Sequence, residues 1–313
     1  MFSRRTALAA SCAVSAVLVL AACGSGDSSG ATSSSSSAAN HTVSVVASTN
    51  VWGDVVKQVA GDLAGSRVDI TSIISNPDAD PHSYEANTQN QLALSTAKLV
   101  VENGGGYDDF VHTMLSSAKN TSATVLDAVD ISGKKAPAGG ELNEHVWYDF
   151  PTVRKVAARI ATALSAADPA DASTYAKNVT AFDARLAAMQ ATEASIRKAH
   201  SGDAVAITEP VPLYLLQACG LVNRTPEEFS EAIENGTDVS AAVLHETLDL
   251  FSSKKVDLLA YNEQTSGPQT EAVLKAAKAN GIPVVPVTET LPSGKDYLTW
   301  MEGNLSAVGK ALG

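Results

Sequence analysis

The sequence is short of positive charge. Its 313 residues include 22 Lys and Arg against 34 Asp and Glu, which gives a formal net charge of −12. A surface of that sign repels phosphate groups at long range, so DNA, RNA and anionic lipid headgroups are excluded as the principal partners. The length allows one large domain or two lobes, with enough residues for a buried core.

Long hydrophobic runs are also scarce, and the single candidate is at the N-terminus. Arg4 and Arg5 precede an uncharged apolar stretch over residues 6–22, which is short for a membrane span and has the layout of a signal peptide (1–22). The following Leu20-Ala21-Ala22-Cys23 resembles a bacterial lipobox, in which Cys23 becomes the lipidated first residue of the mature protein. The sequence leaves open whether export uses the general secretory or the twin-arginine route.

Cysteine is too rare for a disulfide framework. Of three cysteines, Cys12 leaves with the signal peptide and Cys23 carries lipid, so Cys219 has no partner and is expected to be a small buried side chain. Residues 23–40 are rich in Ser and Gly, bury nothing and are predicted to be a flexible tether.

Motifs of several enzyme classes are missing. The segment His245-Glu246-Thr247-Leu248-Asp249 lacks the second histidine of a zinc protease helix, and the three glycines at 104–106 lack the spacing of a dinucleotide-binding turn. No Gly-x-Ser-x-Gly or Walker sequence occurs. These absences favour a binding protein over an enzyme.

What is present is a repeated alternation of strand and helix patterns. Apolar strands are predicted at 42–47, 68–74 and 98–102, with helices at 51–63 and 89–95. After residue 200 the pattern restarts, with strands at 204–208, 256–261 and 282–287 and helices at 213–219, 241–253, 271–280 and 297–312. This order is typical of parallel sheets covered by helices.

The middle of the chain is helical. Residues 152–167 and 170–198 have helical patterns, and Asp168-Pro169 between them is a helix-start signal. We therefore predict an α/β fold of two similar lobes, at 41–150 and 201–313, joined through a helical section (151–200) that contains one long helix.

Two of the six histidines lie where ligands bind. His41, His112, His200 and His245 are assigned surface or packing roles. His82 in Asp80-Pro81-His82 and His145 in Glu144-His145-Val146 lie in loops, the first after a strand end where α/β sheets place ligands. Imidazole suits transition metals, but two histidines need further donors, and Glu209 directly after a strand is a candidate.

Four ordered segments carry a resemblance to a known family. DPHSYE, HVWYD, ADPADASTYAKNVTAFDARLAAM and ITEPVPLYLLQACGL resemble the metal-binding lipoprotein receptors of zinc and manganese ABC importers, family 9 of solute-binding proteins. The similarity runs in order through residues 43–312. It implies a metal cleft between the lobes.

The resemblance also implies site residues. His82, His145 and Glu209 match three metal ligands, and the fourth does not transfer cleanly: the loop after the strand at 256–261 offers oxygen donors at Asn262, Glu263, Gln264 and Ser266. Asp80 and Asp149 are expected to orient the ligand histidines by accepting a ring N–H, and Trp147 is expected beside the site.

The function implied is capture of a transported cation. The chain would be a monomeric receptor, anchored by lipid to the outer face of the bacterial cytoplasmic membrane, that passes Zn²⁺ or Mn²⁺ to the permease and ATPase of an ABC importer. The His-rich loop of many zinc receptors is absent at 134–145, while the Irving–Williams order favours zinc, so the metal stays open. A metal-dependent hydrolase, a receptor for a non-metal solute and an adhesin remain alternatives.

Overall fold

The computed structural model describes residues 42–79, 81, 84 and 87–313. The predicted signal peptide, Cys23 with the tether, Asp80 and His82 lie outside the described residues. Residues 40–313 form one unit by their internal contacts. Within the described residues, no helix is both long enough and apolar enough to cross a membrane.

The first sheet has four parallel strands in the order β2-β1-β3-β4. Its central strands are rich in valine and buried on both faces, as covered parallel strands require. Val45 faces one hydrophobic cluster and Val46 faces another, so the sheet has helices on each side. The strands are β1 (Val43–Thr49), β2 (Val68–Ile74), β3 (Leu99–Glu102) and β4 (Thr124–Asp127).

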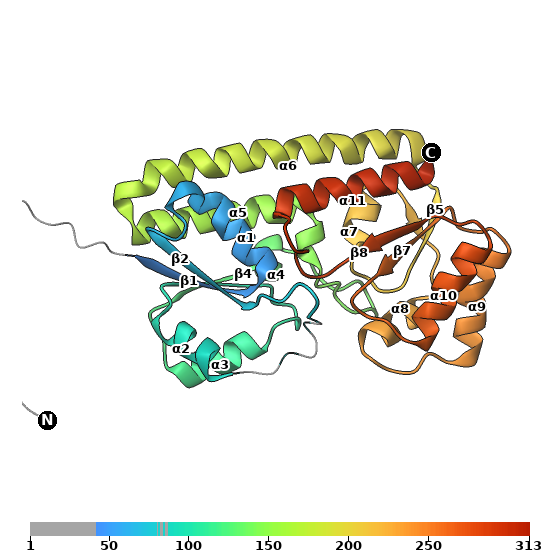
Figure 1. The fold of residues 1–313 in the computed structure, drawn as a ribbon, viewed down its shortest axis with the longest axis horizontal. Coiled ribbons are helices and arrows are strands. Elements are labelled where there is room, and N and C mark those ends of the chain that lie inside the picture. The colour runs from blue at the N-terminus through green and yellow to red at the C-terminus, as the bar shows by residue number, and fades with distance from the viewer. Residues whose placement is uncertain (1–41, 80, 82–83, 85–86) are drawn as a thin grey trace, which may run out of the picture. The chain divides into compact units, whose positions relative to one another are not determined.

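Two pairs of helices cover this sheet (Figure 1). On one face lie α1 (Asn50–Ala60) and α5 (Phe150–Ala167), and on the other lie α2 (Thr88–Thr96) and α3 (Phe110–Ala118). The short helix α4 (Ala128–Ser132) follows β4 directly.

The second sheet repeats the arrangement of the first. Its parallel strands are ordered β6-β5-β7-β8, with β5 at Ala204–Ile207, β6 at Val222–Asn223, β7 at Leu258–Asn262 and β8 at Val284–Val287. One face packs on α9 and α10, and the other on α7 and α11. These helices and α8 have the following bounds: α7 (Leu213–Ala218), α8 (Glu227–Glu234), α9 (Ala241–Ser252), α10 (Pro268–Ala279) and α11 (Tyr297–Leu312).

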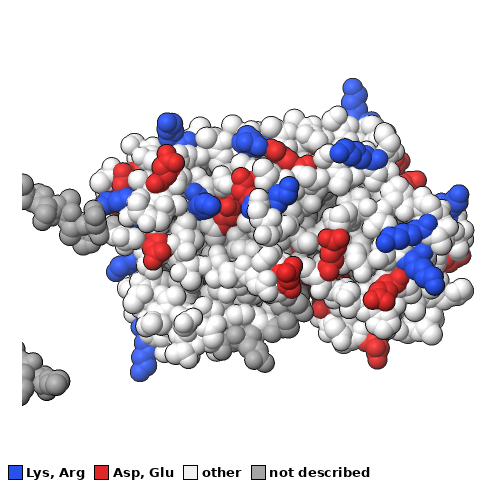
Figure 2. Space-filling model, viewed as in Figure 1, with Lys and Arg blue, Asp and Glu red and all other residues white. Residues whose placement is uncertain are grey.

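A single helix of 29 residues, α6 (Ala172–His200), runs along both lobes (Figure 1). Its buried side chains include Tyr175 near one end and Ile196 near the other. Both belong to one hydrophobic cluster that contains Val45 of the first sheet and Val205 of the second. The lobes therefore share a core. The face that α6 and α11 cross carries basic and acidic side chains interspersed (Figure 2).

The start of α6 differs from the expected one. Pro169–Asp171 forms a 3-10 turn, and the helix begins two residues later than predicted. The carboxylate of Asp168 lies 2.8 Å from the guanidinium of Arg67, and it accepts a 3.2 Å hydrogen bond from Tyr175. Burial opposes the charged form of Asp168, but the hydrogen bonds of Arg67 and Tyr175 outweigh it and lower the pKa of this carboxyl. The side chain of Asp168, which the local pattern predicted to cap the helix, therefore pairs with Arg67, a residue distant in sequence.

The predicted fold class is confirmed: two parallel sheets with covering helices form two lobes joined by a long helix. The prediction missed β4, α4, β6 and α8, and it placed His112 inside a helix without giving the bounds of α3. Most of these are short, and β4 exposes two of its four residues, so it lacks the apolar run that marked the other strands. Cys219 is a free, fully buried thiol, as predicted.

Candidate metal centre

His145 enters the space between the lobes from the loop before α5. Its backbone N–H donates to the side-chain oxygen of Asn143 at 3.1 Å, and its ring Nδ1 lies 2.8 Å from the same oxygen. Because an amide oxygen only accepts, Nδ1 carries the proton and Nε2 is the atom with a lone pair for a cation. The ring is fully buried, and the ring centroid of Trp147 lies 5.0 Å away.

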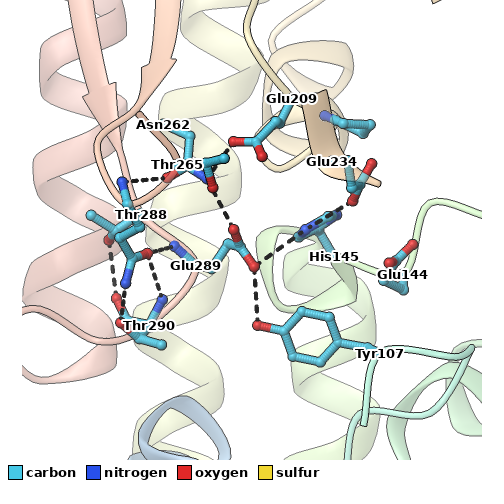
Figure 3. Close-up of polar contacts among 12 residues, drawn as sticks. Tyr107, Glu144, His145, Glu209, Glu234, Asn262, Thr265, Thr288, Glu289 and Thr290 are labelled. Atoms are coloured by element: carbon cyan, nitrogen blue, oxygen red, sulfur yellow. Dashed lines mark hydrogen bonds and ion pairs between the residues drawn. The ribbon is translucent and has the colours of Figure 1, made fainter. Parts of the chain in front are cut away.

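Two carboxylates of the second lobe face this region from the ends of parallel strands (Figure 3). Glu209 follows β5 and is 3% exposed, and Glu289 follows β8 and is 2% exposed. Polar groups at the carboxyl ends of neighbouring strands converge at one edge of an α/β sheet. Oε2 of Glu289 lies 4.0 Å from Nε2 of His145.

Asn262 links these two carboxylates. It ends β7, the strand between β5 and β8, and it is 1% exposed. Its amide nitrogen donates to Oε2 of Glu209 and, at 2.9 Å, to Oε1 of Glu289. One side chain thus fixes both carboxylates from the strand between them.

A residue of the first lobe, Tyr107, also contacts Glu289. The hydroxyl of Tyr107 donates to Oε2 of Glu289 at 3.3 Å (Figure 3). Burial, reinforced by the charge of Glu289, raises the pKa of Tyr107 well above its usual value, so the hydroxyl stays protonated and remains a donor.

Gln264 joins the loops around the site. Its amide oxygen accepts from the backbone N–H groups of Glu289 and Thr290, and its amide nitrogen donates to Thr290 Oγ1 at 2.6 Å. The same nitrogen donates to the carbonyl of Pro77 in the first lobe at 2.8 Å. The backbone of Glu289 is therefore tied to both lobes.

Two more carboxylates lie beside His145. Glu144 precedes it, and Glu234 ends α8 with Oε1 3.5 Å from Nε2 of His145. Glu144, His145 and Glu234 each offer one ligand atom, and these three atoms lie within 4.8 Å of one another. The adjoining cavity of about 800 Å³ has an acidic wall, because Glu141, Glu227 and Glu231 line it together with Glu144 and Glu234.

The chemistry of this cluster suits a divalent cation. Collecting carboxylates in a buried space is unfavourable by several kcal/mol per ion unless positive charge is close. An imidazole nitrogen and carboxylate oxygens together are ligands for Zn²⁺, Mn²⁺ or Fe²⁺.

The structure brings some of the predicted residues together and separates others. His145 and Glu209 lie in the buried cluster. Glu263 and Ser266 are exposed, and Asn262 and Gln264 act as hydrogen-bonding groups that hold the carboxylates. His82 and Asp80 lie outside the described residues.

Asp149 has a role other than the one predicted for it. Its carboxylate caps α5 by accepting from the N–H of Thr152 at 3.0 Å, and its other oxygen lies 3.2 Å from Nζ of Lys134. The side-chain oxygen of Asn143, and not Asp149, lies 2.8 Å from Nδ1 of His145.

Glu289 and Glu234 were missed by the sequence analysis. Glu289 follows a predicted strand just as Glu209 does, so the rule that selected Glu209 selects Glu289 as well. Glu234 had no such signal, because α8 itself was not predicted.

The fold and this cluster define a two-lobed α/β protein with a buried, cation-compatible centre between its lobes. A family model described as zinc-uptake complex component A, periplasmic, matches residues 45–311. The chain belongs to this family.

Curated relatives are metal-binding proteins of several kinds. The chain is 31% identical over 179 residues to the metal ABC transporter substrate-binding lipoprotein ScbA of Streptococcus cristatus, and 28% identical over 181 residues to the manganese ABC transporter substrate-binding lipoprotein PsaA of Streptococcus mitis. Each match covers 54% of this chain and 54% of the relative, so the chain spans about half the length of these relatives. The iron ABC transporter substrate-binding lipoprotein MtsA of Streptococcus pyogenes serotype M1 is 25% identical over 287 residues, covering 86% of this chain and 89% of MtsA.

Solved structures share the fold. The laminin-binding adhesin Lmb from Streptococcus agalactiae aligns with a TM-score of 0.73 at 22% identity, covering 87% of this chain and all of that one. The binding protein FpvC from Pseudomonas aeruginosa, in complex with Mn²⁺, aligns with a TM-score of 0.71 at 22% identity, covering 87% and 98%.

Proposed function

We propose that this protein is the substrate-binding lipoprotein of an ABC importer for a divalent transition metal. The observation that carries the proposal is the hydrogen bonding of Asn262 to both Glu209 and Glu289, whose carboxylates lie on the side of the second lobe that faces His145. Family membership supports transport over catalysis.

The ligands in this proposal are His82 and His145 from the first lobe and Glu209 and Glu289 from the second. Glu289 takes the fourth position, in place of the donors at 262–266. It is buried beside His145 and oriented by Tyr107 and Asn262, whereas Glu263 is exposed. Glu234 is close enough to His145 to assist a cation entering along the acidic cavity.

Zinc and manganese are the cargo we propose. Two imidazoles with two carboxylates are hard enough for Mn²⁺, and Zn²⁺ binds more tightly to almost any such set. Relatives are named for manganese and for iron, and the family is described by zinc uptake, so availability outside the cell would decide which ion is carried.

The N-terminal segment would anchor the protein, and the rigidity of the two lobes bears on how the metal is delivered. Lipidation of Cys23 would hold the protein on the outer face of the cytoplasmic membrane, beside the permease and ATPase. The shared core and α6 favour a small rocking of the lobes over a wide hinge motion, so docking on the permease would loosen the ligands of one lobe relative to the other.

Metal analysis of protein purified without added metal tests the proposal, followed by competition between Zn²⁺ and Mn²⁺. We expect one ion to be retained by the site between the lobes. Glu289→Gln should weaken binding at least about tenfold, a loss of about 1.4 kcal/mol or more, whereas Glu263→Gln on the neighbouring exposed loop should bind as the unaltered protein does. Equal binding by the unaltered protein, Glu289→Gln and His145→Ala would refute the proposed site.

A further inference from the structure

A second group of metal-ligating side chains lies in the first lobe, and it shares no residue with the cluster around His145. Glu102, His112 and Asp127 each offer a ligand atom, and these atoms lie within 4.8 Å of one another. His112 had been assigned a surface or packing role from the sequence alone.

The topology of the sheet creates this group. Glu102 is the last residue of β3 and pairs in register with Asp127, the last residue of the neighbouring parallel strand β4. Val100, two positions before Glu102, packs against the cluster that includes Val111 of α3. Side chains two apart on a strand point to the same face, which places Glu102 beneath α3 and next to His112.

Glu102 is the unusual member. Its side chain is 1% exposed, and neither of its carboxylate oxygens accepts a hydrogen bond from the described residues. Oε1 lies 3.0 Å from Nε2 of His112, an ion-pair distance. A buried carboxylate without donors is costly and is normally found paired or bound to a cation.

The surroundings add negative charge. Burial and then the charges of Asp108, Asp127, Asp109 and Asp130 raise the pKa of Glu102 to about 8. The hollow beside the group, about 320 Å³, is lined by Asp130 and by exposed Arg159. Asp108 and Asp109 precede α3, Asp127 ends β4, Asp130 lies on α4 and Arg159 lies on α5.

An ion pair between Glu102 and His112 is a simpler explanation of the buried carboxylate, but it does not account for Asp127 or for the second oxygen of Glu102. A protonated His112 would neutralise one carboxylate, while Asp127 would remain beside it and the second oxygen of Glu102 would still have no donor. Oδ1 of Asp127 accepts from the backbone N–H of Asp130 at 2.8 Å, which fixes the direction of this carboxylate. A divalent cation would displace the proton that the raised pKa leaves on Glu102, neutralise both carboxylates and bind the neutral imidazole.

We propose that Glu102, His112 and Asp127 form a second site for a divalent transition-metal ion, open to solvent and separate from the site between the lobes. One imidazole nitrogen with two carboxylate oxygens, completed by water, is a ligand set for Zn²⁺ or Co²⁺, whereas Mg²⁺ and Ca²⁺ prefer oxygen ligands alone. Ligand atoms around zinc are separated by about 3.3 Å when bonds are 2.0–2.1 Å long, so a modest movement closes the group. His112, whose side chain is 63% exposed, is free to make it.

The test is a titration of the whole metal-free protein with Zn²⁺ by calorimetry and with Co²⁺ by visible absorption. The unaltered protein should bind two ions, one more weakly, and His112→Ala should bind one. Glu102→Gln, which keeps the shape of the side chain, should lose the same ion. His200→Ala is the matched control, because His200 also pairs with a carboxylate, that of Asp203 at 2.9 Å, and it should bind two.

His145→Ala separates this proposal from the proposed function. It should retain the weaker ion, and the double variant His145→Ala/His112→Ala should bind none. A single ion that is lost in His145→Ala and kept in both His112→Ala and Glu102→Gln would overturn the second site and leave the proposed function standing. A single ion lost in His112→Ala and kept in His145→Ala would do the reverse.

Discussion

The hydroxyl of Tyr107 in the first lobe donates a 3.3 Å hydrogen bond to the carboxylate of Glu289 in the second. Tyr107 is 4% exposed and Glu289 is 2% exposed, so water does not readily replace either partner. This contact connects the two lobes directly at the proposed metal site, and it makes the position of Glu289 depend on both.

Tyr107→Phe should weaken both the fold and the site. Losing a buried hydrogen bond to a charged group costs about 1.5–3 kcal/mol, and we expect a loss of that size in chemical unfolding, with weaker Zn²⁺ binding. Tyr175→Phe is the control, because Tyr175 also donates to a carboxylate, that of Asp168, away from the site. It should lower stability and leave metal affinity unchanged. Equal metal affinities of the two variants would contradict the role of Tyr107.

Asn262→Ala should reduce metal affinity without removing a ligand. The substitution releases the carboxylates of Glu209 and Glu289 from their shared donor. Loss of a group that orients ligands typically costs 10–100-fold in affinity, and calorimetry should find about that decrease. Asn280→Ala removes a comparable amide, which among the described residues donates to the carbonyl of Ala276 in α10, and this variant should bind metal normally.

Gln264→Glu should loosen the contact between the lobes. The new carboxylate oxygen would face the carbonyl of Pro77, to which the amide nitrogen now donates at 2.8 Å. The Pro77 carbonyl keeps its 2.7 Å hydrogen bond from Thr290 Oγ1, so the expected cost is that of one lost hydrogen bond, about 0.5–1.5 kcal/mol, which denaturant unfolding of the metal-free protein measures. Gln269→Glu on α10 makes the same change of charge outside this network. If it destabilises the protein as much as Gln264→Glu does, the loss comes from charge and not from the contact.

Glu193 on α6 should make the metal-free protein less stable as pH rises. Burial, then the charge of Asp149, raise the pKa of Glu193 from 4.5 to about 7. The folded state therefore holds a proton that the unfolded state releases, so the stabilisation is complete below pH 4.5 and is lost as pH rises through 7. We expect a loss of about 2 kcal/mol across this window from unfolding at a series of pH values.

Glu193→Gln should reduce that pH dependence, because an amide does not titrate, while Glu102, whose pKa is also raised, still contributes to it. Glu246→Gln, at an exposed position of α9, should retain it. An unchanged slope in Glu193→Gln would show that another group causes the dependence.

The local pattern of apolar residues in the sequence predicted the helices and strands whose side chains are buried at regular intervals. The strand at Val68–Ile74 and the helix at Tyr297–Leu312 have the bounds read from the sequence, since valine and isoleucine run through the one and apolar side chains recur at helical spacing in the other. The start of α6 was misplaced because Arg67, about a hundred positions earlier, pairs with Asp168. No window of local sequence contains that partner.

The residues of the candidate site could be predicted from the sequence where they directly follow a predicted strand. Glu209 was found this way, and Glu289 follows the same rule. The sequence could not distinguish Asn262 as a donor to carboxylates from Asn262 as a ligand, because that depends on the strand order β5-β7-β8, which places it between two acids. His112 was passed over because the helix alone does not reveal the buried Glu102 beneath it.

The identical strand order of the two sheets gives each strand of one lobe a counterpart in the other, and β3 corresponds to β7. Glu102 ends β3 and Asn262 ends β7. The chain thus uses one architectural position twice: in the first lobe it presents a carboxylate that attracts charge, and in the second an amide that directs the carboxylates on either side. At this position the first lobe has an acid of the proposed second site, and the second lobe has an amide that orients the two acids of the proposed site between the lobes.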